Sequence, residues 1–489
     1  MKGKFSTMNA NSELLPPLKN VQNYKWRRFY TSRVLELPTF SKAADMAPAT
    51  QNLFQILSEA SRSNNGIIVR ESVSGRRTSS RISYKHLYQD SLLRSHRLRL
   101  IEGFGKNPIV LFYVNSHLDS IKWFWAIVAA GAVPCPLPAF SRDPQKRKAH
   151  FEALQKLFNS PFIITTESLL PDFDDGMQNT LCVHIGERIE AHDDFPIPKV
   201  VPGLRKKTHE LAVLMLTSGS TGEAKAVALT HGNIFSAVDG KSRTLTTTST
   251  DIFLGWTGLD HVANLTEIHL HAMKVSATQI QVHESMVVNE PLEYLQMLSD
   301  FKISYTFAPN FILTSMVEAL ENVFIQLEGA EDQPTAQSIM SGSIFGVCTE
   351  ADSRNFPGDT SRFDFSNLRN LVSGGEPNVV ATCLKLTCAM FYFGAPGTFI
   401  RPALGLTESC AGAIYNMRCP YYDLENDLKY CSLGYPTEAA GVKITRDENG
   451  MDKADIGELG FVLLSGPAIF EKYHNNLPKT IESFTHNGW

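Results

Sequence analysis

The sequence predicts an α/β protein, in which helices cover mostly parallel sheets and a smaller β-rich part follows. Apolar runs of strand length alternate with amphipathic helical stretches over most of the chain after residue 50. Strands separated by helices in this way usually pair in parallel. After Leu433 the pattern changes to short strands separated by turns. The length of 489 residues, 43% of them hydrophobic, provides for about three domain-sized units.

The expected elements follow in chain order. Strands are predicted at 108–114, 161–165 and 211–216, and helices at 119–130 and 146–158, with a break at 131–136. Farther along, helices are predicted at 261–273 and 291–301, and strands at 303–307, 441–445 and 458–464.

The chain is predicted to consist of a leader and a core. Residues 1–48 are polar and punctuated by prolines, which predicts an extended N-terminal leader. The core, 49–489, is divided into α/β parts at 49–250 and 251–430 and a β-rich part at 431–489.

Composition and charge exclude several classes of protein. The formal net charge of −4 leaves no basic excess to neutralise a phosphate backbone, so no nucleic-acid partner is expected. The longest apolar stretches fall well short of the ~20 residues that cross a bilayer, so no membrane partner is expected. Residues 1–20 hold no secretory signal, and the eight cysteines form no CxxC pair. We therefore expect a cytoplasmic protein with reduced thiols.

The loop after the predicted strand 211–216 carries the chemistry. Residues 217–225 read Thr-Ser-Gly-Ser-Thr-Gly-Glu-Ala-Lys. Glycines let the backbone approach an anion, while N–H groups, hydroxyls and a lysine surround phosphate oxygens. The common nucleotidase loop needs glycine and lysine side by side, and here two residues separate them. The alternative is a flexible surface loop. The expected phosphate ligands are Thr217, Ser218, Gly219, Ser220, Thr221, Gly222 and Lys225.

This loop and the following Leu229-Thr-His-Gly-Asn233 resemble the phosphate-loop signature of the adenylate-forming superfamily, which contains acyl-CoA synthetases, luciferases and adenylation domains of nonribosomal peptide synthetases. The family usually has proline where Ala224 stands. Residues 373–377, Ser-Gly-Gly-Glu-Pro, resemble its adenine-side turn. Residues 403–408, Ala-Leu-Gly-Leu-Thr-Glu, resemble its aromatic-Gly-x-Thr-Glu motif, with Leu404 in place of the aromatic residue. Residues 433–436, 457–459 and 465–473 match later turns in the same order.

The resemblance implies a cofactor pair and a set of site residues. ATP and Mg²⁺ are the implied cofactors, with Glu408 as the metal ligand. Lys225, Thr407 and Glu408 are the implied catalytic residues. Besides the phosphate loop, the nucleotide is expected to contact Gly375, Glu376, Pro377, Leu404, Gly405 and Thr407. Leu404 should pack on adenine less well than a tyrosine would.

The resemblance also implies the architecture: the large N-terminal core of an adenylate-forming enzyme, with two helix-covered, mostly parallel sheets and a small distorted β-barrel. Residues 484–489 resemble the start of a motif whose aspartate holds the ribose, and the sequence stops before that aspartate. The C-terminal lid and its catalytic lysine are therefore expected to be absent. Such a core should be weakly active or inactive alone.

Mapping by motif places the acid-binding pocket. An aspartate at the place of Asp260 pairs with the substrate ammonium in amino-acid-activating members. A histidine at the place of His261 often caps the carboxylate end in acyl- and aryl-activating members, so both classes of acid remain open. The expected pocket residues are Asp260, His261, Asn264, Thr306, Val372, Gly374, Ala403 and Ala411.

The implied function is activation of an amino or aryl acid as an acyl-adenylate. The acyl group would pass to the phosphopantetheine thiol of a downstream carrier domain, as in fungal synthetase-like enzymes. One alternative is a free-standing acyl- or aryl-CoA ligase. Another, of a different class, is a non-catalytic nucleotide-binding protein that keeps the fold.

Three further groups of residues are interpreted as structural. His261, His269, His271 and His283 suggest a metal site, but the spacings within 261–271 do not match the four-residue repeat that brings side chains together on a helix. Trp123 and Trp125 are expected to take part in helix packing. The acidic stretch 172–175, Asp-Phe-Asp-Asp, is expected to form a solvated loop.

Overall fold

The computed structural model describes residues 51–73, 76–106, 109–159, 161–173, 182–190, 201–218, 224–327, 340 and 362–489. The leader predicted for residues 1–48 lies outside these ranges. The described residues belong to one unit, 44–489. None of the helices in this described part of the chain is long and apolar enough to cross a membrane.

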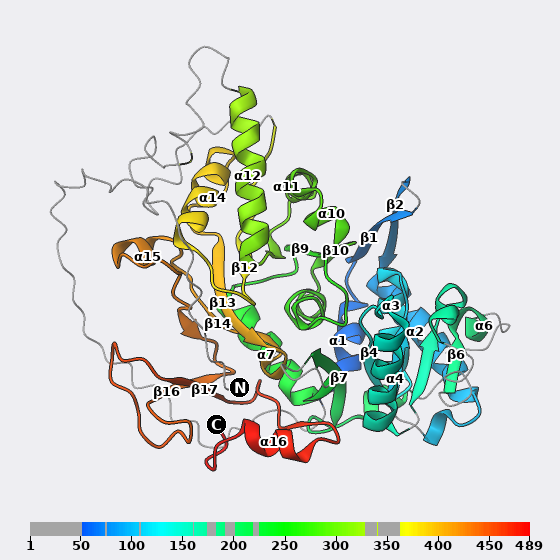
Figure 1. Ribbon diagram of the computed structural model, residues 1–489. Helices are drawn as coiled ribbons and strands as arrows, with labels where there is room; N and C mark the ends of the chain where they lie inside the picture. The colour runs from blue at the N-terminus through cyan, green and yellow to red at the C-terminus, as the bar shows by residue number, and fades with distance from the viewer. Residues whose placement is uncertain are drawn as a thin grey trace, which may run out of the picture. The chain divides into compact units, whose positions relative to one another are not determined.

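A nine-stranded sheet forms the centre of this unit (Figure 1). The strands from β13 to β1 are parallel, while β2, β14 and β15 join the edges antiparallel. In spatial order they are β15 (Tyr435–Pro436), β14 (Ala411–Tyr415), β13 (Ile400–Leu406), β12 (Asn370–Ser373), β11 (Tyr305–Phe307), β9 (Ile252–Gly255), β10 (Thr278–Val282), β1 (Gly66–Val73) and β2 (Arg76–Ser83).

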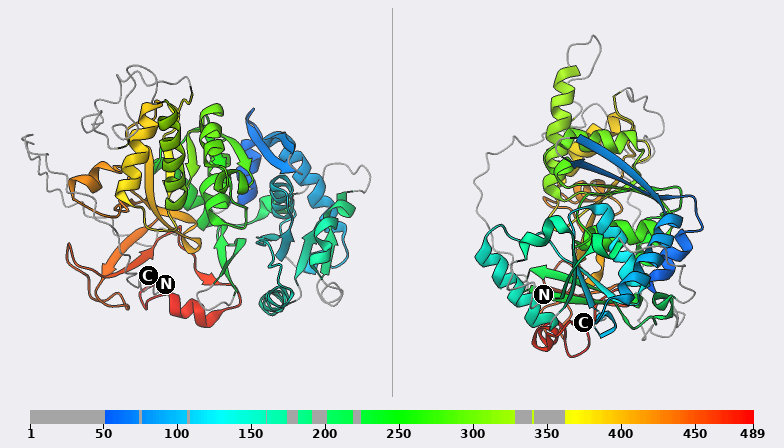
Figure 2. Two further views of the ribbon diagram at one scale, coloured as in Figure 1. Left: turned by 45° about the horizontal axis from the view of Figure 1, so that its top comes forward. Right: turned by 90° about the vertical axis from the view of Figure 1, so that its right-hand side faces the viewer.

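Helices cover both faces of the large sheet, because neighbouring side chains on a strand point to opposite faces. Leu254 and Leu371 pack with α10 (Ser285–Val288), α11 (Pro291–Asp300), α12 (Asn310–Leu327) and α14 (Val380–Tyr392). Phe253 and Val372 face the other way, toward the helical run 262–274. That run consists of α8 (Val262–Asn264), a π-helical turn at Leu265–His269 and α9 (Leu270–Lys274). In Figures 1 and 2, α12 and α14 lie side by side.

The second sheet has four strands, all parallel. Its order is β4 (Val133–Pro136), β3 (Ile109–Tyr113), β5 (Phe162–Thr165) and β6 (Cys182–Ile185). One face packs against α4 (Pro144–Phe158), and the other against α2 (Tyr84–Leu100) and α3 (His117–Ala129). Trp123 and Trp125 are buried on α3, as predicted. Helices α1 (Leu53–Ala60) and α7 (His231–Thr244) share the core of α2 and α3.

The remaining strands are antiparallel. Strands β18 (Lys472–Tyr473), β8 (Ala224–Thr230) and β7 (Leu211–Ser218) form one sheet, and β16 (Gly441–Thr445) with β17 (Phe461–Ser465) another. Within the described ranges these strands form two separate sheets, which do not close into the small barrel that the resemblance implied. The shorter helices are α6 (Gly186–Glu190), α15 (Tyr421–Glu425) and α16 (Leu477–Ser483).

The α/β class and the two mostly parallel sheets are confirmed, and most predicted elements lie within a few residues of their expected positions. Two details differ. Residues 131–136 were expected only as a break, yet they contain β4, and the helix predicted at 261–273 contains a π-helical turn. The division near residue 250 stays a prediction. Strand β1 precedes it but pairs with β10, which follows it, and β2 extends the same sheet by pairing with β1.

Candidate functional site

The predicted phosphate loop joins two paired strands. Thr217 at the end of β7 faces Lys225 at the start of β8, and Ser218 faces Ala224. Alternate residues of β7 enter two different cores, so the strand that leads into the loop is held on both sides. Residues 219–223 lie outside the described part, so the phosphate contacts expected of Gly219, Ser220, Thr221 and Gly222 stay predictions.

Strand β18 brings a third segment to this place. Its pairing sets Tyr473 opposite Val227 on β8, and the Lys225 ammonium lies 5.5 Å from the centre of the Tyr473 ring. The Tyr473 hydroxyl donates a 2.6 Å hydrogen bond to Oε1 of Glu408. Phe470 N–H donates to the Glu408 carbonyl at 2.8 Å. Lys225 and Glu408, 183 positions apart by their numbers, therefore meet around one tyrosine.

One carboxylate oxygen of Glu408 accepts no hydrogen bond from the described residues. The residue is only 6% exposed, and its Oε2 has no hydrogen-bond partner among the described residues. A buried carboxylate oxygen without a partner is unfavourable unless a cation or donor reaches it. Burial, reinforced by the bond to Glu408, raises the pKa of Tyr473, so the phenol remains a donor at neutral pH. A carboxylate held in this way fits Mg²⁺, which prefers oxygen ligands.

The turn after Glu408 has an unusual backbone. Cys410 and Ala411 have φ of 55° and 69°, a left-handed conformation that costs non-glycine residues free energy. Ser409 stabilises the turn, since its hydroxyl donates to the Ala411 carbonyl and accepts from Leu406 N–H. Thr407, the neighbouring candidate, is half-buried, and Gly405 pairs with Gly412 across β13 and β14.

A buried ion pair supports the same turn. Lys241 on α7 lies 3.0 Å from Oε2 of Glu267 in the π-helical turn, and both side chains are at most 2% exposed. The Lys241 ammonium also donates to the Cys410 carbonyl, at 2.5 Å. Gly412 N–H donates to Glu267 at 3.0 Å. The pair thus holds the backbone on both sides of Ala411.

Two tyrosines complete the surroundings of Glu267. The hydroxyls of Tyr305 on β11 and Tyr415 on β14 both donate to Oε1 of Glu267, each at 2.7 Å. Burial alone would raise the pKa of Glu267, but Lys241 and the two hydroxyls lower it below the ordinary value. The sequence analysis missed this network, which connects α7, β11 and β14 to one carboxylate of the π-helical turn.

The predicted adenine-side turn is exposed. Gly375, Glu376 and Pro377 follow β12, and Gly375 has φ of 86°, where glycine is favoured. The Glu376 carboxylate accepts a 2.8 Å hydrogen bond from Phe311 N–H, which fixes the turn to the first turn of α12. Leu404, half-buried on β13, packs against the small cluster formed by Ala413, Ile414 and Ala440.

Two apolar residues of the expected acid pocket, Val372 and Gly374, lie at the carboxyl end of β12, and Ala403 lies on the neighbouring parallel strand β13. Val372 and Ala403 belong to one cluster, and Gly374 is so close that a Cβ there would lie 2.6 Å from the Ala403 carbonyl oxygen. Ala411 is buried in a different cluster, at the start of β14. Ligands of parallel α/β sheets usually bind at these strand ends.

The polar residues of the expected pocket differ in how many hydrogen bonds their side chains already form within the protein. Thr306 donates to the Leu254 carbonyl at 3.0 Å and shares a 2.8 Å hydrogen bond with Tyr294. Asn264 donates to Gln281 at 3.1 Å, and only its Oδ1 lacks a partner among the described residues. Thr306 and most of Asn264 are therefore engaged within the protein.

Asp260 and His261 are less constrained. His261 is exposed, and its Nδ1 accepts from Ala263 N–H at 3.1 Å, so it caps α8. Asp260 is half-buried and packs against Gly258. No described Lys, Arg or His forms an ion pair with it, and burial, with Glu284 nearby, raises the pKa of its carboxyl. A cation beside this carboxyl group would stabilise its charged form.

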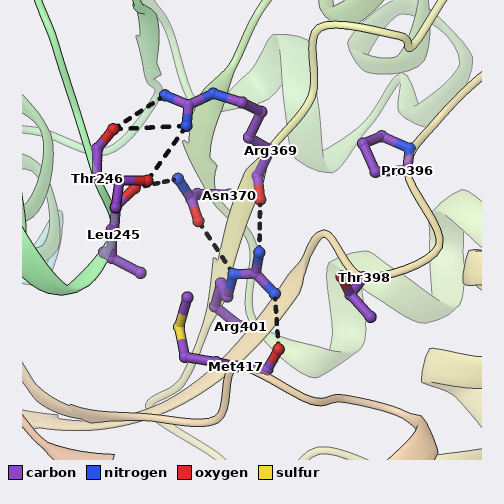
Figure 3. Close-up of a pocket in the computed structure, with 8 residues that line it drawn as sticks. All are labelled: Leu245, Thr246, Arg369, Asn370, Pro396, Thr398, Arg401 and Met417. Atoms are coloured by element: carbon purple, nitrogen blue, oxygen red, sulfur yellow. Dashed lines mark hydrogen bonds between the residues drawn. The ribbon is translucent and has the colours of Figure 1, made fainter. Parts of the chain in front are cut away.

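A separate pocket lies at the opposite, amino ends of β12 and β13. The pocket has a volume of about 250 Å³. Arg369 and Arg401 are among the residues that line it (Figure 3). Arg401 donates to Asn370 and to the carbonyls of Arg369 and Met417, while Arg369 pairs with Asp251. The lining residues are Leu245, Thr246, Arg369, Asn370, Pro396, Thr398, Arg401 and Met417, none of which is a predicted site residue.

The histidines do not come together as a metal site. His269 bonds to Trp125 and Gln279, and His271 to Thr247. His283 bonds to Ser285. They do not form a joint ligand group in the described part of the chain. Of the acidic residues 172–175, Asp172 accepts from Tyr113, and 174–175 lie outside the described ranges.

Comparison with known proteins identifies the family. Residues 60–474 match the family described as AMP-binding enzyme. The chain belongs to this family. Recognition of the adenylate-forming ligases from the motifs is thereby confirmed, and enzymes of this family use ATP, typically with Mg²⁺.

Relatives of the chain include proteins named nonribosomal peptide synthetases. Microperfuranone synthase of Emericella nidulans is 36% identical over 441 residues, which cover 90% of this chain and 43% of that protein. The chain thus spans less than half the length of this curated relative.

Solved structures share the fold. The structure of McyG A-PCP complexed with phenylalanyl-adenylate is 23% identical, with a TM-score of 0.73 over 91% of this chain and 64% of that chain. The adenylation domain of a keto acid-selecting NRPS module, bound to keto acyl adenylate, is 21% identical, with a TM-score of 0.70 over 90% and 77%. This AMP-binding enzyme therefore has the adenylation-domain fold.

Proposed function

We propose that this AMP-binding enzyme activates an amino or aryl acid as an acyl-adenylate, for transfer to the phosphopantetheine thiol of a carrier domain. The observation that carries the proposal is the meeting of Lys225 and Glu408 around Tyr473, with one Glu408 oxygen left without a partner. An ammonium and a buried carboxylate therefore lie beside the loop that follows β7, which supports Lys225 as a phosphate ligand and Glu408 as a metal ligand.

The proposed reaction joins a carboxylate oxygen to the α-phosphorus of ATP while the bond to pyrophosphate breaks. Lys225, together with the hydroxyls and N–H groups of 217–222, binds the phosphates and neutralises their charge. Thr407 contacts phosphate, and Glu408 holds Mg²⁺. The metal supplies additional charge neutralisation on the phosphate oxygens. The protein chiefly aligns the acid and the nucleotide in line.

The nucleotide base is assigned to the turn after β12. Gly375, Glu376 and Pro377 would contact adenine from one side, and Leu404 with Gly405 from β13. Because the Glu376 carboxylate already accepts from Phe311 N–H, its backbone rather than its carboxylate would meet the base.

Asp260 distinguishes between the two classes of acid. Its half-buried carboxylate has no cationic partner among the described residues, so a substrate ammonium would supply the missing charge. This favours an amino acid. The keto acyl adenylate in the solved relative shows that the same fold in that protein holds an acid of another kind. Val372, Gly374, Ala403 and Ala411 would form the apolar wall, since three of them are small.

The carrier partner is supported by the relatives. One solved structure is an A-PCP protein, and a curated relative is a synthase more than twice as long as this chain. A cytoplasmic setting is supported by the six cysteines found free in the described ranges, as expected of a reducing compartment.

Binding tests the proposal independently of any lid. Titration calorimetry with ATP and Mg²⁺, and with an acyl-sulfamoyl adenylate mimic, should give saturable binding. Glu408→Gln should weaken the Mg²⁺-dependent part about 100-fold, because the metal loses a charged ligand. Glu425→Gln, at an exposed carboxylate, is the matched control and should leave binding unchanged. If the chain binds neither ATP nor the mimic, a non-catalytic protein that keeps the fold is favoured.

Exchange and transfer assays address the substrate and the acceptor. Because the core is expected to be weakly active or inactive alone, acid-dependent ATP–pyrophosphate exchange is measured on the chain extended through a C-terminal lid. A panel of amino, aryl and aliphatic acids should then identify one preferred class. Transfer of the activated acyl group to free coenzyme A, but not to a pantetheinylated carrier domain, would replace the proposal with a CoA ligase.

A further inference from the structure

Three cysteines that are far apart in the sequence lie close together beside α14. Cys383 lies on α14, Cys419 follows β14, and Cys431 lies between α15 and β15. The sulfur of Cys431 is 3.7 Å from that of Cys383 and 3.8 Å from that of Cys419, and all three lie within 4.8 Å of one another. Within the described residues, no other three His, Cys, Asp or Glu side chains bring ligand atoms together this closely.

The sulfur spacing matches a known coordination geometry. Zinc–sulfur bonds of about 2.3 Å at tetrahedral angles place the sulfurs about 3.8 Å apart. A disulfide would instead need two sulfurs at about 2.05 Å. We propose that Cys383, Cys419 and Cys431 bind one Zn²⁺ ion as thiolates, with a fourth, non-sulfur ligand. This site is separate from the nucleotide site and does not depend on the proposed function.

A fixed carboxylate lies beside the three sulfurs. Asp423 is fully buried and interacts with Cys431. Its carboxylate is oriented by Ser432 N–H at 2.7 Å and by Asn416 at 3.1 Å. Carboxylates fixed in this way commonly orient metal ligands or supply a further one.

The segment that contains Cys419 and Cys431 buries little apolar surface, although backbone hydrogen bonds join Lys429 to Val380 and Cys431 to Asn378 at the start of α14. Between residues 417 and 433, the buried residues are Cys419, Pro420 and Asp423. Its large apolar side chains are instead mostly exposed, at Met417, Tyr422, Leu424, Leu428, Tyr430 and Leu433. Because hydrophobic stabilisation grows with buried apolar area, this segment gains little from it, and a bound metal would add to its stability. A zinc ion would fix the connection between β14 and β15 to α14.

Metal analysis of the purified 489-residue chain tests this proposal. After expression with added zinc and purification with a reductant, elemental analysis should find about one zinc per chain. Cys383→Ser, Cys419→Ser and Cys431→Ser should each reduce the zinc content at least about 10-fold. Cys388→Ser is the matched control, because it lies on the same helix but outside the cluster, and it should retain the metal.

A spectroscopic measurement on the unmodified chain covers the case in which a serine variant fails to fold. Cobalt(II) added to zinc-depleted protein should give thiolate-to-cobalt charge-transfer absorption and the intense visible bands of a tetrahedral site, and zinc should remove both. The proposal is overturned if the unmodified chain holds no zinc and gives no such spectrum with cobalt. It is equally overturned if mass spectrometry finds two of the three cysteines as a disulfide, or if all three serine variants keep their zinc.

Discussion

The hydroxyl of Tyr473 donates a 2.6 Å hydrogen bond to Glu408, so a residue of β18 fixes the proposed metal-binding carboxylate. Because the same ring lies 5.5 Å from the Lys225 ammonium, Tyr473 contacts both charged groups of the site. Tyr473→Phe keeps the ring and removes only the hydrogen bond. We expect about 10-fold weaker apparent Mg²⁺ affinity in the presence of ATP, as for other groups that orient a metal ligand. Titration of ATP binding against Mg²⁺ measures this.

Tyr430→Phe, at a half-exposed tyrosine away from the site, should not change the Mg²⁺ titration. Equal behaviour of the two variants would show that Glu408 needs no support from Tyr473.

Removing one partner of the buried pair Lys241–Glu267 should lower the free energy of unfolding strongly. Glu267→Gln leaves the Lys241 ammonium buried without its counter-ion, and we expect the free energy of unfolding to fall by about 3–5 kcal/mol. The double variant with Lys241→Met and Glu267→Leu should lose less than Glu267→Gln, because no charge stays buried. Urea unfolding of the single and double variants makes the comparison.

Lys479→Ala provides the exposed counterpart, since its pair with Glu482 is at the surface. Its effect should stay within about 0.5 kcal/mol. If Glu267→Gln is as mild as this control, the pair does not hold the turn at Cys410.

Asp260 should destabilise the ligand-free protein at neutral pH. Its folded-state pKa is raised above the ordinary 3.8, so the folded chain binds more protons than the unfolded chain above that pH. Stability attributable to this group therefore falls as pH rises through 3.8 and levels off above the folded pKa. Asp260→Asn should remove this loss, so its advantage in unfolding free energy should grow with pH from 3.8. An advantage that is the same at every pH would contradict this reasoning.

The same substitution tests the class of acid. If the substrate carries an amine, Asp260→Asn should lower the ATP–pyrophosphate exchange activity with the preferred amino acid about 100-fold, because the substrate ammonium loses its counter-ion. Aryl acids that lack the amine should be unaffected. Unchanged exchange with amino acids would remove the amine-binding role of Asp260.

His269 should make the protein sensitive to acid. Trp125 donates to its Nε2 at 2.9 Å, so the neutral ring carries its proton on Nδ1 and donates to Gln279. Burial lowers the pKa of His269 from 6.5 to about 4. The unfolded chain thus binds the extra proton first, and stability should fall by about 3 kcal/mol as pH drops from 6.5 to 4.

Urea unfolding across this pH range should show a shallower decline in His269→Gln than in the unmodified chain. His86→Gln, at an exposed histidine, serves as the control and should follow the unmodified chain. A decline that is identical in all three proteins would assign the acid sensitivity to other groups.

The short-range motifs were the most informative part of the sequence. Thr217–Lys225 and the segment around Glu408 could be recognised because each combines glycines, hydroxyls and charges within a few residues. The structure places the described ends of these segments together. It also shows why β4 was missed: its two prolines suggested a break, but β4 is an edge strand, where proline needs no ladder hydrogen bond on its open side.

Long-range contacts between common residue types could not be predicted in this way. Nothing in the local sequence connects Tyr473 with Lys225, or Glu267 with Lys241 and Tyr415. The three cysteines at 383, 419 and 431 are separated by 36 and 12 positions, which is no recognised ligand pattern, and only the packing of α14 against the segment after β14 brings them together. The π-helical turn was also missed, because one extra residue in a short helix hardly changes its apolar period.

The left-handed backbone at Ala411 limits how the pocket can be re-engineered. This residue is a proposed wall of the acid site and also the point at which the chain reverses into β14. A branched side chain introduced there to exclude large acids would add steric strain to the reversal, so selectivity and foldability would change together. Ala403, on β13, does not have a left-handed backbone and so lacks this coupling. Attempts to alter acid size should therefore begin at Ala403, with glycine as the tolerated replacement at Ala411.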